Sequence, residues 1–100
     1  RTYLHMAAVF ACNFANHMYT LSAYLLEKQG LPFDAMLPLI DETARKVHTL
    51  CPTEAQTGPA VRKDANVMNK HLEMLAEEPE LKEIYKIISK SICHSGQNEV

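Results

Sequence analysis

The chain has 100 residues, of which 47% are hydrophobic and 22% are charged, and its net charge is −2. This composition is that of an ordinary soluble globular protein, and the length allows a single domain near the small end of the usual range. Acidic and basic residues are interspersed, so the basic footprint of a nucleic-acid-binding protein is absent. We therefore expect no nucleic acid among the partners.

The first predicted element is a very long helix that starts at Thr2 and stops before Gly30. From Thr2 to Leu26 it contains no Asp, Glu, Lys or Arg. Asn, His, Thr and Ser interrupt this run, whereas a spanning helix needs about 20 predominantly apolar residues, so we predict no membrane association. The helix should be roughly 40 Å long, about as long as a domain of this size is wide. We expect a partner to cover apolar surface at its flank.

Polar residues of this helix are not scattered. At 100° per residue they fall within one stripe about 120° wide, and such a stripe normally carries Lys and Glu when it faces solvent. Because this stripe is almost uncharged, we predict that it faces other protein or a polar cleft. Asn13 and His17 are close enough to bond each other or to share one ligand, and His5 lies about two turns earlier. The stripe consists of Thr2, His5, Asn13, Asn16, His17, Thr20 and Glu27.

Three more main helices are predicted. The second begins near Pro32, with Asp34 as its N-cap, and ends at Pro52. The third is capped by Asp64, and the fourth starts with Pro79 at its first position. No strand-like alternation occurs, so the predicted fold is all-α, with a helical domain over residues 1–93 and a flexible tail over residues 94–100.

One longer loop, AQTGPAVRKD at residues 55–64, separates the second and third helices. Gly58 and Pro59 are suited to a turn. The amide of Gln56, the hydroxyl of Thr57 and the guanidinium of Arg62 are groups that a simple connector does not require, and the fork of Arg62 suits a carboxylate or phosphate. We predict that this loop lines a ligand-binding cleft.

The remaining chemistry-bearing residues predict no complete site. Cys12, Cys51 and Cys93 are widely spaced without a CxxC pair, which indicates free thiols and a cytoplasmic protein. The histidines outside the first helix share no ligand spacing, so no metal site is expected. A P-loop, a dinucleotide fingerprint and a nucleophile elbow are all absent from the sequence.

Four ordered segments carry a family resemblance: HMAAVFACNFANHMYTL, GLPFDAMLPLIDETARKV, AQTGPAVRKD and KHLEMLAEEPELKEIYKIISKSI. Together they resemble the C-terminal helical domain of a family of bacterial oxidoreductases that has a Rossmann-like domain upstream. That domain is similar in plan to those of ketopantoate reductase, pyrroline carboxylate reductase and 6-phosphogluconate dehydrogenase. The family usually has Ser where this chain has Cys12, and RGD where it has Arg62, Lys63 and Asp64. The lysine that hydroxyacid dehydrogenases place on the long helix is absent.

The resemblance implies that an upstream Rossmann domain binds NADP or NAD, and that the helical domain forms a homodimer and closes one wall of the active cleft on a small-molecule substrate. In this hypothesis His5, Asn13 and His17 are catalytic, and Gln56, Thr57 and Arg62 contact substrate or cofactor. The chain by itself is not expected to be an enzyme. The alternative is a purely structural dimerisation module whose polar stripe is buried against a second copy.

Overall fold

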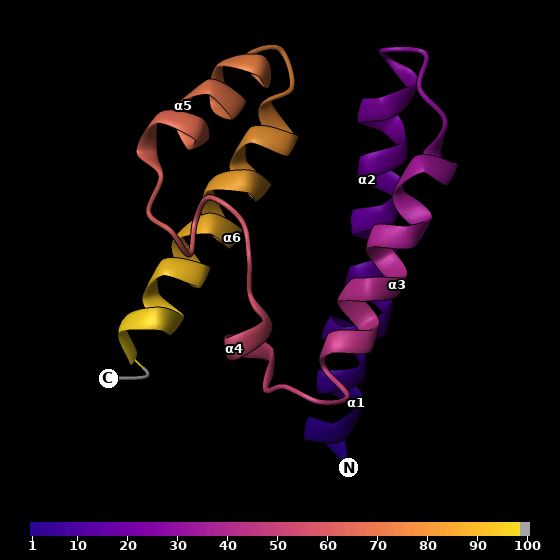
Figure 1. Ribbon diagram of the computed structural model, residues 1–100, viewed down its shortest axis with the longest axis vertical. Helices are drawn as coiled ribbons and strands as arrows, with labels where there is room; N and C mark the ends of the chain where they lie inside the picture. The colour runs from indigo at the N-terminus through magenta and orange to yellow at the C-terminus, as the bar shows by residue number, and fades with distance from the viewer. Residues whose placement is uncertain (99–100) are drawn as a thin grey trace. The chain divides into compact units, whose positions relative to one another are not determined.

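The computed structural model describes the backbone of residues 1–98 and the side chains of residues 1–95, and every regular element in this part is helical (Figure 1). The predicted all-α fold is therefore confirmed. The chain forms two compact units, unit 1 being Arg1–Asp41 and unit 2 beginning at Glu42. Each unit is described by itself. The elements are α1 (Thr2–Ala8), η1 (Val9–Phe14), α2 (Ala15–Glu27), η2 (Phe33–Met36), α3 (Leu37–Lys46), α4 (Pro52–Ala55), α5 (Ala65–Met74) and α6 (Pro79–Asn98).

The long first helix is present, but it is not uniform. Elements α1, η1 and α2 follow one another without a break, and η1 is a π-helix of 6 residues. The helix ends as predicted at Gly30, which has a left-handed φ of 68°. The amide of Gly30 bonds to the carbonyl of Glu27, and that of Leu31 to Leu26, both at 3.0 Å. These two bonds are a Schellman motif, in which glycine takes the left-handed position at little cost.

In unit 1 the chain returns against the long helix through the 3₁₀ turn η2. The rings of Tyr19 and Phe33 lie 6.5 Å apart between centroids. The prediction that Asp34 caps the second helix is wrong, because Pro32 occupies the N-cap position of η2 and no side chain caps it. Asp34 lies in the first turn instead, where a carboxylate is favoured by the positive end of the helix dipole.

The second helix is shorter than predicted. The boundary between the units falls inside α3, which ends at Lys46, and both Val47 and Cys51 are exposed. Pro52 does not end this helix but starts the short helix α4. Proline fits the first helical position, because a backbone N–H there would have no hydrogen-bond partner within the helix. In unit 2 the ammonium of Lys46 donates to the carbonyl of Ala55 at 3.1 Å and so ties the end of α3 to the end of α4.

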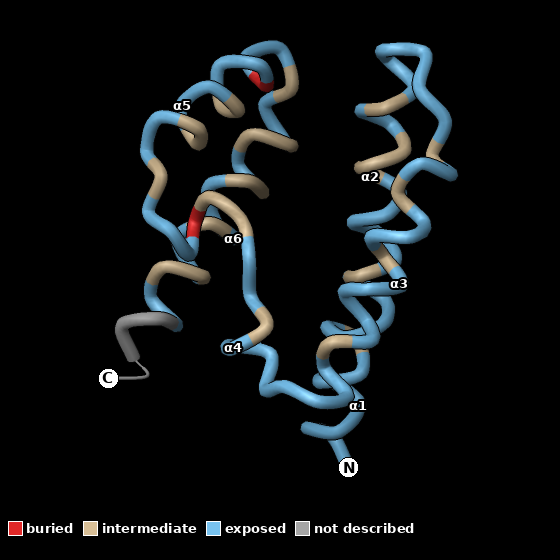
Figure 2. The backbone as a smooth tube through the Cα atoms, in the orientation of Figure 1, coloured by how far each residue is buried: buried red, intermediate tan, exposed pale blue. Residues whose placement is uncertain are grey.

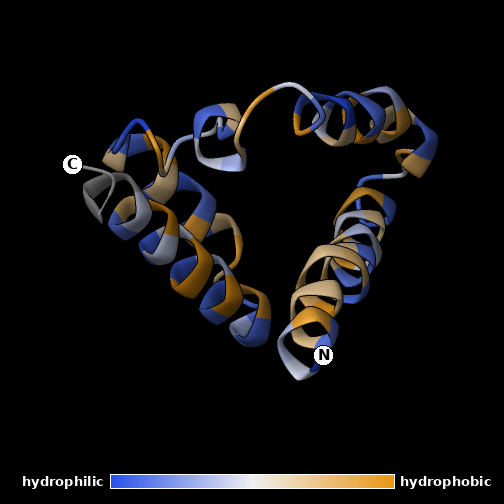
Figure 3. Cartoon of the chain, turned by 90° about the horizontal axis from the view of Figure 1, so that it is seen from below, coloured by the Kyte–Doolittle hydropathy of each residue, from blue (hydrophilic) through white to orange (hydrophobic). Residues whose placement is uncertain are grey.

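Helices α5 and α6 form the main body of unit 2. The Asp64 cap is confirmed, since its carboxylate accepts a hydrogen bond from the amide of Val67 at 3.2 Å. Hydrophobic and hydrophilic residues alternate along α6, as expected for an amphipathic helix (Figure 3). The most buried hydrophobic residues in the described chain are Ala60, 5% exposed, and Leu75, 9% exposed (Figure 2).

Helix α6 starts at Pro79 as predicted and continues to Asn98. The tail predicted over residues 94–100 is therefore helical as far as Asn98, and residues 99–100 lie outside the described part. Within that part no helix combines the length and the apolar character that crossing a membrane requires.

Candidate functional site

The three site residues predicted on the long helix come from its three different segments. His5 lies in α1, Asn13 in η1 and His17 in α2, and all three are exposed. Among the residues described, no hydrogen bond joins Asn13 to His17, so the mutual bond that their spacing allows is not made. Thr20, from the same polar stripe, donates to the carbonyl of Asn16 at 3.4 Å. In the isolated chain these side chains are available to a ligand or partner.

The π-helix changes which residues of the predicted polar stripe lie on the same side of the helix. Its hydrogen bonds enclose one residue more than those of an α-helix, and one residue corresponds to about 100° of rotation. On an uninterrupted α-helix His5, Asn13 and His17 would spread over about 120°. With the extra residue taken up by η1, they come within about 20° of one line along the helix. We call these three residues the polar line.

Asn16 and Thr20 move away from the polar line by the same rotation. Asn16 lies about 80° from it and Thr20 about 40°. The predicted stripe of seven residues therefore becomes wider, while the three residues chosen as candidate catalytic groups become better aligned. An amide between two imidazoles offers hydrogen-bond donors and acceptors to one elongated ligand.

The loop after α4 is shaped by a second Schellman motif. The amide of Asp64 bonds to the carbonyl of Pro59 at 2.9 Å, and the amide of Lys63 bonds to Ala60 at 3.1 Å. Lys63 occupies the left-handed position with a φ of 55°. This position usually takes glycine, because an L side chain there approaches the following carbonyl. Arg62 immediately precedes it and is exposed.

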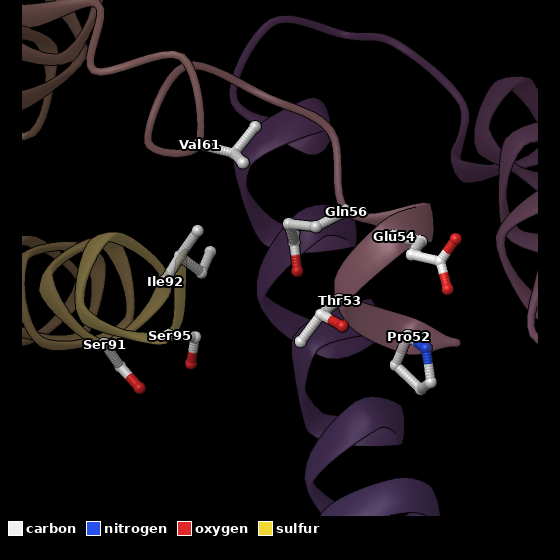
Figure 4. Close-up of a pocket in the computed structure, with 8 residues that line it drawn as sticks. All are labelled: Pro52, Thr53, Glu54, Gln56, Val61, Ser91, Ile92 and Ser95. Atoms are coloured by element: carbon white, nitrogen blue, oxygen red, sulfur yellow. The ribbon is translucent and has the colours of Figure 1, made fainter. Parts of the chain in front are cut away.

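The loop residues chosen from the sequence lie in unit 2, and they do not act as one group. The amide nitrogen of Gln56 donates to the carbonyl of Thr57 at 3.0 Å, so these two are joined. Gln56 also lines a cavity of about 340 Å³, whereas Thr57 and Arg62 are not among its lining residues (Figure 4). The cavity is bounded by α4, the loop and α6, with the lining residues Pro52, Thr53, Glu54, Gln56, Val61, Ser91, Ile92 and Ser95.

The lining of this cavity is largely apolar and includes a few hydroxyl groups. Thr53, Ser91 and Ser95 contribute hydroxyl groups around the apolar side chain of Ile92. The carboxylate of Glu54 turns away from the side where the two serines lie (Figure 4). No Lys or Arg is among the lining residues, so the cavity does not suit a phosphate or carboxylate ligand. Sequence reasoning missed the two serines, although their four-residue spacing on one helix face was a usable signal.

A histidine and a tyrosine that the sequence did not single out join α5 to α6. The Nδ1 atom of His71 and the hydroxyl of Tyr85 are 2.8 Å apart, and their rings meet edge to face with centroids 5.7 Å apart. Burial raises the pKa of the Tyr85 hydroxyl above its usual value. The pair is half-buried inside unit 2, so we interpret it as a structural contact.

One cysteine makes a structural contact. Cys12, Cys51 and Cys93 form no disulfide bond, and the Sγ of Cys93 donates to the carbonyl of the buried Ala60 at 3.2 Å. This bond ties α6 to the loop. In the part of the chain that the structure covers, no group of three or more His, Cys, Asp or Glu side chains could hold a metal ion.

The fold and the site together define a small all-α domain that presents uncharged polar groups on an exposed helix face. The chain belongs to the family described as Domain of unknown function (DUF2520), whose model matches residues 1–92. No curated protein matches the chain.

Among solved structures, the chain is similar to the crystal structure of a putative NADP oxidoreductase from Bacteroides fragilis. The two share 62% sequence identity with a TM-score of 0.90, over 92% of this chain and 36% of the other. The chain thus spans about a third of that protein's length. The resemblance to the helical domain of an oxidoreductase family is confirmed.

Proposed function

We propose that this chain is the substrate-side helical domain of a cytoplasmic, bacterial NADP-dependent oxidoreductase. The observation that carries the proposal is the 62% identity to an NADP oxidoreductase described as putative, over 92% of this chain. The polar line supports it, because a cleft that handles a carbonyl or hydroxyl substrate needs hydrogen-bonding groups, which this line offers. The nicotinamide cofactor, NADP or alternatively NAD, is bound mainly by a Rossmann domain upstream of residue 1.

The chain's own residues divide the work as follows. Asn13 or His17 orients the substrate's carbonyl or hydroxyl oxygen by a hydrogen bond. A histidine of the polar line donates the proton that the oxygen needs when a carbonyl is reduced, or accepts it in the reverse direction. The cofactor, when bound, supplies or accepts the hydride. No lysine occurs on this helix, and we assign the proton transfer to His5 or His17.

We propose that side chains of the loop contact the substrate or the cofactor. Arg62 is exposed on the Schellman turn and can offer its planar fork to an anionic group of the substrate or cofactor. Gln56 and Thr57, six and five residues before it, offer an amide and a hydroxyl. Because the neighbouring cavity carries no cationic side chain, we place only neutral parts of a ligand there.

The experiment uses the full-length protein and follows NADPH consumption with a panel of aldehydes, 2-oxo acids and cyclic imines, to find one that is reduced. Asn13→Ala and His17→Ala are then compared with Asn16→Ala, an exposed amide on the same helix but off the polar line. Loss of a group that transfers or orients the proton should lower kcat by about 10²-fold or more. Asn16→Ala should stay within about twofold, as expected for a surface change away from the reacting groups. Unchanged turnover in both test variants would remove the catalytic assignment.

The second candidate function is a purely structural homodimerisation module. Exposed apolar residues favour it, since nine of the eighteen exposed large hydrophobic side chains in the described part lie between Tyr3 and Leu25. This hypothesis predicts that the variants of the polar line change subunit association and leave turnover unaltered. Measuring both quantities on the same proteins separates the two functions.

A further inference from the structure

Four large hydrophobic residues recur at a strict four-residue spacing along the first helix. They are Met6, Phe10, Phe14 and Met18, and we call them the apolar ridge. Their exposed fractions are 47%, 65%, 49% and 36%. The rings of Phe10 and Phe14 meet edge to face with centroids 5.0 Å apart, so these two side chains lie on the same side of the helix.

The π-helix keeps the apolar ridge straight. On a regular α-helix, residues four apart drift by about 40° at each step, so Met6 and Met18 would end about 120° apart. The extra residue enclosed by η1 takes back about 100°, which leaves a deviation of about 20°. The ridge therefore runs along one side of the helix for about 18 Å.

The apolar ridge and the polar line lie on different sides of the helix. With the same geometry, the ridge is about 90° to 100° around the axis from His5, Asn13 and His17. A helix of this kind can bury its ridge against a partner and still present the polar line to a ligand. The polar stripe therefore need not be buried for the helix to dimerise.

We infer that the apolar ridge is the seam on which a second copy of this chain packs, antiparallel, about a two-fold axis level with residue 12. The inference rests on the homodimer of the second candidate function and names its contact surface. The order Met, Phe, Phe, Met reads the same in both directions. A two-fold axis at that level sets Met6 against the partner's Met18, and Phe10 against the partner's Phe14. Such a self-complementary patch is what an isologous interface requires.

Charge and composition fit this occupant. No Asp, Glu, Lys or Arg occurs from Thr2 to Leu26, so two copies of the ridge meet without opposing like charges. Aromatic residues and methionine are the types enriched in the cores of protein interfaces. A partner with a charged groove would find no complementary group on this side of the helix.

The exposed area is large enough for such an interface. The chain exposes 8045 Å². Two separately compact units of these sizes would together expose about 6,900 Å² by the usual scaling with mass. The surplus of about 1,100 Å² exceeds the roughly 800 Å² that each partner contributes to a standard interface. Half of the exposed large hydrophobic residues in the described chain lie on the helix that carries the ridge.

The first test measures the mass of the full-length protein in solution by sedimentation. We expect a dimer, and a monomer for the double variant Phe10→Glu with Phe14→Glu. The matched control is Ile87→Glu, a carboxylate at an apolar residue of α6 that is 67% exposed, and it should remain a dimer. A monomeric parent protein would overturn the inference, as would a double variant that remains a dimer.

The second test fixes the register and does not depend on the folding of the glutamate variants. Cys12, Cys51 and Cys93 are first changed to serine. In that background Met6→Cys with Met18→Cys should form a covalent dimer on mild oxidation, because a disulfide needs Cα atoms about 4.4 to 6.8 Å apart. Met6→Cys alone should not, because the two copies of residue 6 lie about 18 Å apart along the seam. Efficient cross-linking by Met6→Cys alone, or none by the double variant, would overturn the antiparallel register.

The two proposals fail in different measurements. If the ridge is not the seam, the masses and cross-links change from those expected, while the Asn13→Ala and His17→Ala losses of turnover remain. If the polar line is not catalytic, turnover persists in those variants and the protein is still a dimer through the ridge.

Discussion

Lys63 provides the sharpest test of how the loop is built. It holds a φ of 55° at the left-handed position of the Schellman motif that closes the turn before α5. For an L residue this conformation costs about 1 to 2 kcal/mol, and glycine avoids that cost. Glycine loses more backbone freedom on folding, which takes back about 0.5 to 1 kcal/mol. We therefore expect Lys63→Gly to stabilise the protein by about 0.5 to 1 kcal/mol.

The assay is thermal and urea unfolding followed by circular dichroism. A gain of that size corresponds to a rise in Tm of roughly 2 to 8 °C for a domain of this length. Lys63→Ala is the control, because it removes the side-chain charge but keeps the steric cost at Cβ. If Lys63→Gly is no more stable than Lys63→Ala, the left-handed φ at this position does not lower the free energy of unfolding as we infer. The family resemblance is consistent with the expected direction, since related sequences usually have glycine here.

Gly30 gives the reverse case. Its φ is 68°, and a Cβ added there would meet no other atom within 4 Å, so Gly30→Ala tests backbone conformation alone and should cost about 1 kcal/mol in urea unfolding. Asp64→Ala removes the cap of α5 and should cost about 1 kcal/mol, with Asp64→Asn retaining most of the stability. Tyr85→Phe removes the bond to His71 and should cost about 0.5 to 1.5 kcal/mol at neutral pH. Because burial raises the pKa of Tyr85, the folded state favours its neutral form. The stability that this hydroxyl contributes is therefore fully present below the pKa of tyrosine in the unfolded state, and it is lost as the pH rises through the pKa in the folded state. The variant should therefore lose less stability than the parent as the pH rises past about 10, the ordinary pKa of tyrosine. Deleting Ala11 should convert η1 to regular α-helix and keep the apolar ridge aligned, so the dimer should persist with unchanged helical circular dichroism; dissociation would contradict the geometry.

Features that depend on neighbouring residues could be predicted from the sequence. Gly30 marks the end of the long helix, Asp64 caps α5 and Pro79 starts α6, each because one side chain or its absence satisfies or avoids a local backbone requirement. The all-α class followed from the hydrophobic spacing. The family and its oxidoreductase association followed from the order of four segments along the chain.

Other features were missed because the local signals were ambiguous. Proline at position 52 suits both the end of one helix and the first residue of the next, and the chain uses it to start α4. Asp34 has the right chemistry for an N-cap, but the N-cap position lies two residues earlier and is occupied by Pro32. The π-helix could not be foreseen because periodicity arguments assume 100° per residue throughout. The cavity joins residues far apart in sequence, from Pro52 to Ser95, so no single motif could indicate it.

The sequence by itself determined that this protein is helical, where three of its helices begin or end, and which uncharged polar groups the first helix carries. These depend on short-range sterics and hydrogen bonding, which a few neighbouring residues decide. Only the three-dimensional structure decided which of those groups share a face. One extra residue within a turn rotates everything that follows by about 100°, and it separates the polar line from the apolar ridge.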